Sequence, residues 1–155
     1  MQIAVLSDIH LGKKDELDQF GRNAGAEQGL YELLRYLENH TDKIVLLGDI
    51  FETLRGTAYG RESQKKELIS ILKAYPTIAD KIQNNKKYVL VQGNHDLVTK
   101  EVLNAASAYR IKAGDANIAF FHGHQLDPIV GDFWVRNFEK ISVWLGGWLE
   151  RARID

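Results

Sequence analysis

Four short groups of carboxylate, imidazole and amide side chains each follow directly on a run of apolar or β-branched residues. Such side chains are the oxygen and nitrogen donors that hold divalent metal ions, and they also transfer protons. In the first group, Asp8 and His10 could share one cation if an extended backbone turned both to the same side. The groups are Asp8-Ile9-His10, Gly48-Asp49-Ile50-Phe51-Glu52, Gly93-Asn94-His95-Asp96 and His122-Gly123-His124.

Taken alone, most of these residues also have a structural explanation. Asp8 and His10 could be a solvated carboxylate and a loop histidine. Asp49 could cap a helix, or its two oxygens could bridge two metal ions about 3.5 to 4 Å apart. Glu52 could hold Asp49 in position without binding metal itself, or it could be an exposed loop carboxylate.

The third group is the most informative. An amide, an imidazole and a carboxylate follow Gly93 in direct succession. Polar residues at the end of a strand often cap helices and turns, but three different groups in a row would need three separate structural roles. This tetrapeptide therefore favours a functional site.

The elements that must position these groups alternate between strand and helix patterns, which predicts an α/β fold. Continuous apolar runs are typical of strands covered on both faces, and regularly spaced leucines predict helices. The expected strands span 3–7, 43–47, 88–92, 109–113 and 117–121, and the expected helices span 28–39, 62–74, 77–83 and 99–106. Because open α/β sheets bind ligands beyond the carboxyl ends of their strands, the polar groups stand where a site is expected.

In this order, the four groups resemble the calcineurin-like metallophosphoesterases over residues 1–128. The resemblance implies an αββα sandwich with mixed sheets. It also implies two divalent metal ions, for which Mn²⁺ is the first choice and Fe or Zn²⁺ the alternatives, because thiolates are absent from the donors. Asp8 and His10 would bind one ion, Asn94 and His122 the other, and Asp49 would bridge them.

The resemblance also implies a reaction. Metal-bound hydroxide would attack a phosphate ester, phosphodiester or pyrophosphate bond. His95 would donate a proton or contact the phosphate, and Asp96 would orient the His95 imidazole. The expected substrate is a small phosphorylated molecule, such as a nucleotide-linked or lipid-linked one.

One departure from the family pattern bears on activity. The pattern normally ends in a Gly-His-x-His block that gives each metal ion a further imidazole, and this sequence has none. Three explanations stay open: the sequence is a shortened piece, His124 replaces a missing ligand, or the protein is a natural degenerate form. His124 could equally be a supporting or loop histidine. In the degenerate case the protein would be a non-catalytic binding or assembly module.

Residues 129–155 form an aromatic segment with a helical pattern. Helical spacing places one apolar stripe along it, made by Trp134, Phe138, Ile141, Leu145 and Trp148. This stripe within 133–149 could pack on the domain, cover an acyl chain, join two subunits or rest on a membrane surface.

Bulk properties predict a single domain over 1–155, with a metal-site core at 1–128. The chain has 155 residues, a formal net charge of -1 and no cysteine. This charge gives no strong nucleic-acid signal. Neither a secretory signal nor an apolar run of transmembrane length is seen, and the lack of cysteine fits a cytoplasmic protein.

Overall fold

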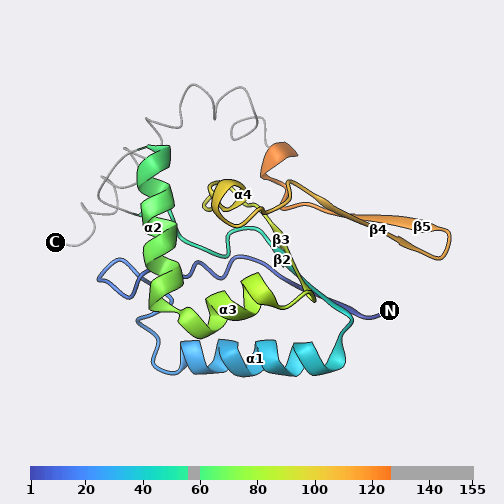
Figure 1. Ribbon diagram of the computed structural model, residues 1–155, viewed down its shortest axis with the longest axis horizontal. Coiled ribbons are helices and arrows are strands. Elements are labelled where there is room, and N and C mark those ends of the chain that lie inside the picture. The colour runs from blue at the N-terminus through green and yellow to red at the C-terminus, as the bar shows by residue number, and fades with distance from the viewer. Residues whose placement is uncertain (56–59, 127–155) are drawn as a thin grey trace.

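The computed structural model describes residues 1–55 and 60–126, and Figure 1 shows the arrangement of their elements. Three strands form a parallel sheet in the order β1-β2-β3, and two more form a separate antiparallel pair. The elements are β1 (Ile3–Leu6), α1 (Ala26–His40), β2 (Lys43–Leu47), α2 (Arg61–Ala74), α3 (Pro76–Asn84), β3 (Tyr88–Val91), α4 (Thr99–Val102), β4 (Tyr109–Ala113), β5 (Ala116–Phe120) and the short 3₁₀ helix η1 (His124–Leu126). The expected α/β class, with parallel and antiparallel sheets, is confirmed.

The parallel sheet is built on β2. In register, Val45 pairs with Val5 of β1 and Val89 of β3. Ile44 and Leu46 of β2 are almost fully buried as well. A strand between two neighbours needs apolar residues on both faces, which explains its unbroken Ile-Val-Leu-Leu run.

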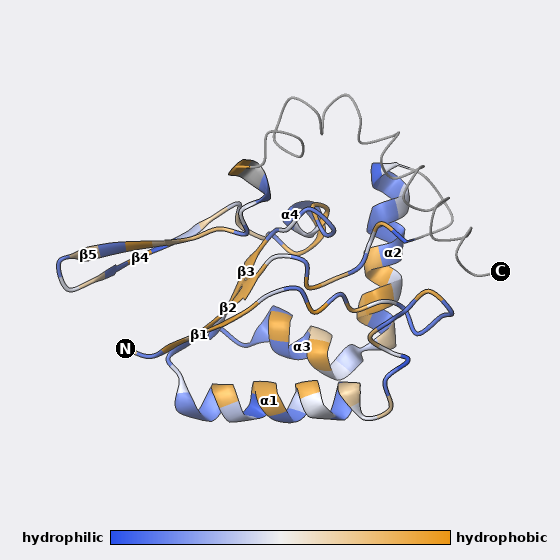
Figure 2. Ribbon diagram, turned by 180° about the vertical axis from the view of Figure 1, so that it is seen from behind, coloured by the Kyte–Doolittle hydropathy of each residue, from blue (hydrophilic) through white to orange (hydrophobic). Residues whose placement is uncertain are grey.

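Helices α1 and α3 lie on the same side of this sheet (Figure 1). Apolar residues spaced three to four apart bury one face of each helix. Figure 2 shows that β1, β2 and β3 consist mostly of apolar residues. The buried cluster consists of Leu11, Leu30, Leu34, Ile44, Leu46, Ile50, Phe51, Leu68, Ile71, Tyr75, Ile78, Tyr88 and Val98. Leu11, Ile50 and Phe51 belong to the loops after β1 and β2, so the core reaches to the polar groups and holds their backbones.

The β4–β5 hairpin extends away from α2 and the other helices (Figure 1). Gly114 takes a φ of 62° in its turn, a left-handed conformation that glycine adopts without strain. Most residues of β5 are exposed, and Ile118 keeps 39% of its surface in solvent. The hairpin nevertheless matters for the site, because β5 leads directly to His122.

The expected element boundaries mostly hold to within two residues. The exception is the helix expected over 99–106, which ends at Val102. Asn104 takes a φ of 56°, and that left-handed conformation cannot continue a right-handed helix. The aromatic segment expected at 129–155 lies outside the described residues. Within 1–55 and 60–126, no helix has the length and hydrophobicity needed to cross a membrane.

Candidate metal centre

The loops after β1 and β2 stay hydrogen-bonded beyond the ends of their strands. The Asp8 N–H donates to the Gly48 carbonyl at 3.2 Å, and the His10 N–H donates to the Asp49 carbonyl at 3.0 Å. Leu11 continues the pattern by donating to Ile50 at 2.9 Å. These bonds set the spacing between the side chains that the two loops carry.

Three of the expected ligands have left-handed backbones. The φ angles are 56° at Asp8, 53° at His10 and 53° at Asp49. Non-glycine residues in this region store strain, and such residues cluster at functional sites. Asp8 and His10 do converge, but the extended alternation assumed from the sequence is wrong, because β1 ends at Leu6 and the loop turns the two side chains.

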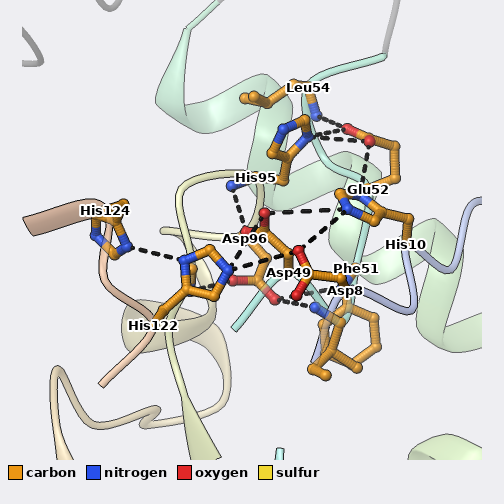
Figure 3. A network of polar contacts seen from close by, with 12 residues as sticks. Asp8, His10, Asp49, Phe51, Glu52, Leu54, His95, Asp96, His122 and His124 are labelled. Carbon is orange, nitrogen blue, oxygen red and sulfur yellow. Dashed lines mark hydrogen bonds and ion pairs between the residues drawn. The ribbon is translucent and has the colours of Figure 1, made fainter. Parts of the chain in front are cut away.

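Four donor atoms from three separate segments face one another (Figure 3). His10 Nε2 lies 4.0 Å from both Asp8 Oδ1 and Asp49 Oδ2. His122 Nε2 lies 3.8 Å from Asp8 Oδ1 and 3.6 Å from Asp49 Oδ2. Two ligands of one cation, each about 2.1 Å from it, can be separated by up to about 4.2 Å. Each of these four pairs is therefore close enough to share an ion.

The carboxylates differ in their surroundings. The side chain of Asp49 is 5% exposed and stands between the two imidazoles, whereas that of Asp8 is 59% exposed. Both imidazoles face Oδ2 of Asp49, while Oδ1 accepts the His95 N–H, so a bridging role would place both cations at Oδ2.

His122 reaches this group because Gly48 has no side chain. A Cβ on Gly48 would lie 2.4 Å from Cδ2 of His122, and the φ of Gly48 is 77°. Both the space and the backbone conformation therefore require glycine there.

Asn94 lies in the loop after β3 and is partly buried. Its neighbours place this loop against Asp49: the His95 N–H donates to Asp49 Oδ1 at 2.9 Å. A Cβ on Gly93 would lie only 2.1 Å from the same oxygen. The three loops after β1, β2 and β3 thus meet at one carboxylate.

Glu52 is 3% exposed, which excludes the exposed loop carboxylate, one of the two alternatives that the sequence left open. Its Oε2 lies 3.1 Å from His10 Nδ1 and 3.0 Å from His95 Nδ1, and Arg55 Nε lies 3.4 Å away. Burial acts to raise the pKa of Glu52, but the hydrogen bonds of His10 and His95 outweigh it and lower the pKa to about 2. Glu52 is therefore a carboxylate that holds two imidazoles by their Nδ1 atoms.

The same contacts act on His95. The hydrogen bond to Glu52 raises the pKa of the His95 imidazole above its ordinary value, in spite of the opposing effect of burial. The His10 and His95 rings meet edge to face, with centroids 4.8 Å apart. His95 therefore lies close to the metal-binding donors, and its hydrogen bond to Glu52 favours the protonated imidazole.

Asp96 has a different role from the expected one. Its Oδ1 accepts the Gly93 N–H at 2.6 Å, and its Oδ2 accepts the N–H groups of Ile50 at 2.9 Å and Phe51 at 3.3 Å. The side chain is fully buried, and burial raises the pKa of its carboxyl. Asp96 ties the loop after β2 to the loop after β3, and the contact to the His95 imidazole expected of it is made by Glu52.

Known proteins place this chain in a family. A family model for calcineurin-like phosphoesterases matches residues 1–149. The chain belongs to the calcineurin-like phosphoesterase family. No curated protein matches it by sequence.

Two solved structures resemble this chain, and the first shares its fold. A dimetal phosphatase from Danio rerio is 15% identical, with a TM-score of 0.51 over 96% of this chain and 50% of the other. A conserved protein from Streptococcus pneumoniae TIGR4, described as a predicted phosphoesterase, is 18% identical, with a TM-score of 0.39 over 98% of this chain and 56% of the other. The chain thus spans about half the length of these two proteins.

The residues of this chain fit divalent metal ions. Donor atoms of Asp8, His10 and Asp49 all lie within 4.8 Å of one another. Carboxylate and imidazole donors without thiolate suit Mn²⁺, Fe or Zn²⁺. The sequence predicted these donors but left open whether Glu52 is buried. Its position three residues after Asp49, directly after the apolar Ile50 and Phe51, was the feature that could have indicated burial.

Proposed function

We propose that this chain hydrolyses a phosphate ester, phosphodiester or pyrophosphate bond at a centre of two divalent metal ions. The observation that carries the proposal is the position of Asp49, whose Oδ2 lies 4.0 Å from His10 Nε2 and 3.6 Å from His122 Nε2. Family membership points to the same chemistry. The fold shared with a protein named as a dimetal phosphatase agrees with two ions.

Each ligand has a part in this proposal. Asp8 and His10 hold one ion, Asn94 and His122 hold the other, and Asp49 bridges them. Mn²⁺ is our first choice for the native metal. Bound divalent ions would neutralise phosphate charge and lower the pKa of a water molecule.

His95 is the proposed proton donor. Glu52 holds its Nδ1, so the Nε2–H of the protonated ring is the group that can reach a substrate oxygen. Proton donation to the leaving oxygen is typically worth about 10²- to 10⁴-fold in rate.

The proposed substrate is a small phosphorylated molecule, nucleotide-linked or lipid-linked. The exposed Asp8 marks the side from which such a molecule can approach, because its side chain is 59% exposed while Asp49 is 5% exposed.

Two variants separate metal binding from proton transfer. Hydrolysis of bis(p-nitrophenyl) phosphate is measured with Mn²⁺, and Mn²⁺ affinity is measured by calorimetry. Asp49→Asn should lose both activity and Mn²⁺ binding, whereas His95→Asn should keep binding and lose about 10²- to 10⁴-fold in kcat. Asp115→Asn, in the exposed hairpin turn, is the matched control. Wild-type activity in Asp49→Asn would overturn the proposal.

A further inference from the structure

The two histidines of the fourth group face each other. His122 Nδ1 lies 3.3 Å from His124 Nδ1, and the ring centroids are 5.4 Å apart. His124 lies on the opposite side of the His122 ring from Asp49 (Figure 3). Nε2 of His122 therefore faces the carboxylates, and Nδ1 of His122 faces His124.

Gly123 makes this arrangement possible. Its φ is 102°, a conformation that L side chains rarely adopt. Its carbonyl accepts the N–H of Leu126 at 2.9 Å, closing the turn at η1. The turn brings together two rings that are only two positions apart in the sequence.

A nitrogen–nitrogen hydrogen bond restricts the protons of both rings. A neutral imidazole carries one N–H and one lone pair, so one Nδ1 must donate and the other must accept. If His122 binds a cation through Nε2, that atom must be free of its proton, and the proton must sit on Nδ1. His124 Nδ1 must then be the acceptor, with the His124 proton on Nε2.

We propose that His124 is a positioning residue: it accepts the Nδ1–H of His122 and so holds His122 in the tautomer whose Nε2 binds metal. This inference rests on the proposed metal centre. It also excludes one of the three explanations for the missing Gly-His-x-His block, since His124 acts through His122 and does not replace a ligand.

The first test is Mn²⁺ affinity of the full chain at one fixed pH. Supporting partners of a metal-bound histidine are typically worth about 10- to 100-fold in affinity, so His124→Leu should weaken Mn²⁺ binding by about that factor. His124→Gln should stay within about threefold of wild type, because the amide oxygen can accept the same proton. His40→Leu, at the exposed end of α1, is the control. Equal affinity in His124→Leu and wild type would overturn the proposal.

The second test observes the protons directly. Long-range ¹H–¹⁵N NMR spectra of the Zn²⁺-bound chain should show His122 protonated at Nδ1 and His124 at Nε2. In His124→Leu, the Nε2–H form of His122 should appear. With diamagnetic Zn²⁺ added, the Nε2 signal of His122 should shift as a metal ligand; direct ligation shifts at a nitrogen of His124 would refute the assignment.

These results distinguish two failures. If Asp49→Asn and His122→Ala bind Mn²⁺ as wild type does, the metal centre itself is wrong. If both lose binding while His124→Leu keeps it, only the role of His124 is wrong. Thermal unfolding of every variant, compared with His124→Gln, separates loss of the contact from loss of the fold.

Discussion

Oε2 of Glu52 lies 3.0 Å from Nδ1 of His95, and the same oxygen lies 3.1 Å from Nδ1 of His10. One buried carboxylate thus orients a proposed metal ligand and the proposed proton donor together. Both rings are held by Nδ1, which directs Nε2 of His10 toward Asp8 and Asp49. The two functions of the site are coupled through Glu52.

Glu52→Gln is therefore expected to damage activity more than stability. A glutamine is neutral and replaces one oxygen with an NH₂ group. In place of Oε2 the NH₂ would face both imidazoles, and in place of Oε1 it would face the Leu54 N–H that this oxygen accepts. We expect kcat with Mn²⁺ to fall by about 10- to 100-fold. Glu101→Gln, a carboxylate paired with Lys65, is the control and should keep wild-type kcat. Unchanged kcat in Glu52→Gln would show that the shared carboxylate is unimportant.

Asp96 leads to the opposite expectation. In the wild-type chain, the backbone N–H groups of Gly93 and Ile50 each donate to an oxygen of Asp96. Asp96→Asn replaces one of these oxygens with an NH₂ group, so a donor then faces a donor. An unsatisfied buried group of this kind typically costs about 1 to 3 kcal/mol. Urea unfolding of the metal-free chain should show that loss, whereas His95→Asn should unfold close to wild type. Similar unfolding midpoints for the Asp96 and His95 variants would contradict the structural role given to Asp96.

Residue types at the ends of strands predicted that Asp8, His10, Asp49 and His122 lie together. Asp8 and Asp49 follow paired parallel strands, and the carboxyl ends of such strands share one edge of the sheet. His122 could be anticipated for a similar reason, since it follows an apolar run. The fold class follows from the alternation of apolar runs and helical patterns.

The partners of those side chains could not be predicted in the same way. Glu52 and Asp96 are both carboxylates close to His95 in the expected site, and the sequence does not show which one reaches the imidazole. The outcome depends on the backbone N–H groups of Ile50 and Phe51. They donate hydrogen bonds to Asp96, and Glu52 is the carboxylate that contacts the imidazoles. Local backbone geometry of this kind, including the positive φ of Asp8, has no periodic signal in a sequence.

Two glycines give a matched pair of opposite predictions. A Cβ on Gly93 would lie 2.1 Å from Asp49 Oδ1 and 2.3 Å from Asp49 N, so Gly93→Ala must displace the central carboxylate. We expect about 1 to 3 kcal/mol of destabilisation and at least about tenfold weaker Mn²⁺ binding. Gly29, within α1, has no atom within 4 Å of such a Cβ. Gly29→Ala should stabilise the chain by about 0.5 to 1 kcal/mol and keep its Mn²⁺ affinity. Normal Mn²⁺ binding by Gly93→Ala would contradict the close packing at Asp49.

The last prediction concerns acid stability away from the metal centre. Glu38, near the end of α1, accepts hydrogen bonds from Lys81 Nζ at 2.6 Å and Tyr88 Oη at 2.8 Å. Burial acts to raise the pKa of Glu38, but these hydrogen bonds lower it below the ordinary value of 4.5. Because the pKa is lower in the folded chain than in the unfolded chain, the contribution of Glu38 to stability is complete above the unfolded value. It is lost as the pH falls through the folded value.

Glu38→Gln should therefore reduce the free energy of unfolding by about 1 to 2 kcal/mol at pH 7, the usual scale for hydrogen bonds to a charged group. The difference from wild type should shrink as the pH falls below 4.5, because the wild-type carboxylate becomes protonated while glutamine does not change. Urea unfolding of the metal-free chain at pH 7, 5 and 3.5 measures this. Glu32→Gln, exposed on the same helix, is the control and should show little difference at any pH. A Glu38→Gln difference that stays constant over that range would mean that Glu38 binds protons equally in the folded and unfolded chains, so that folding does not lower its pKa, against the linkage argued here.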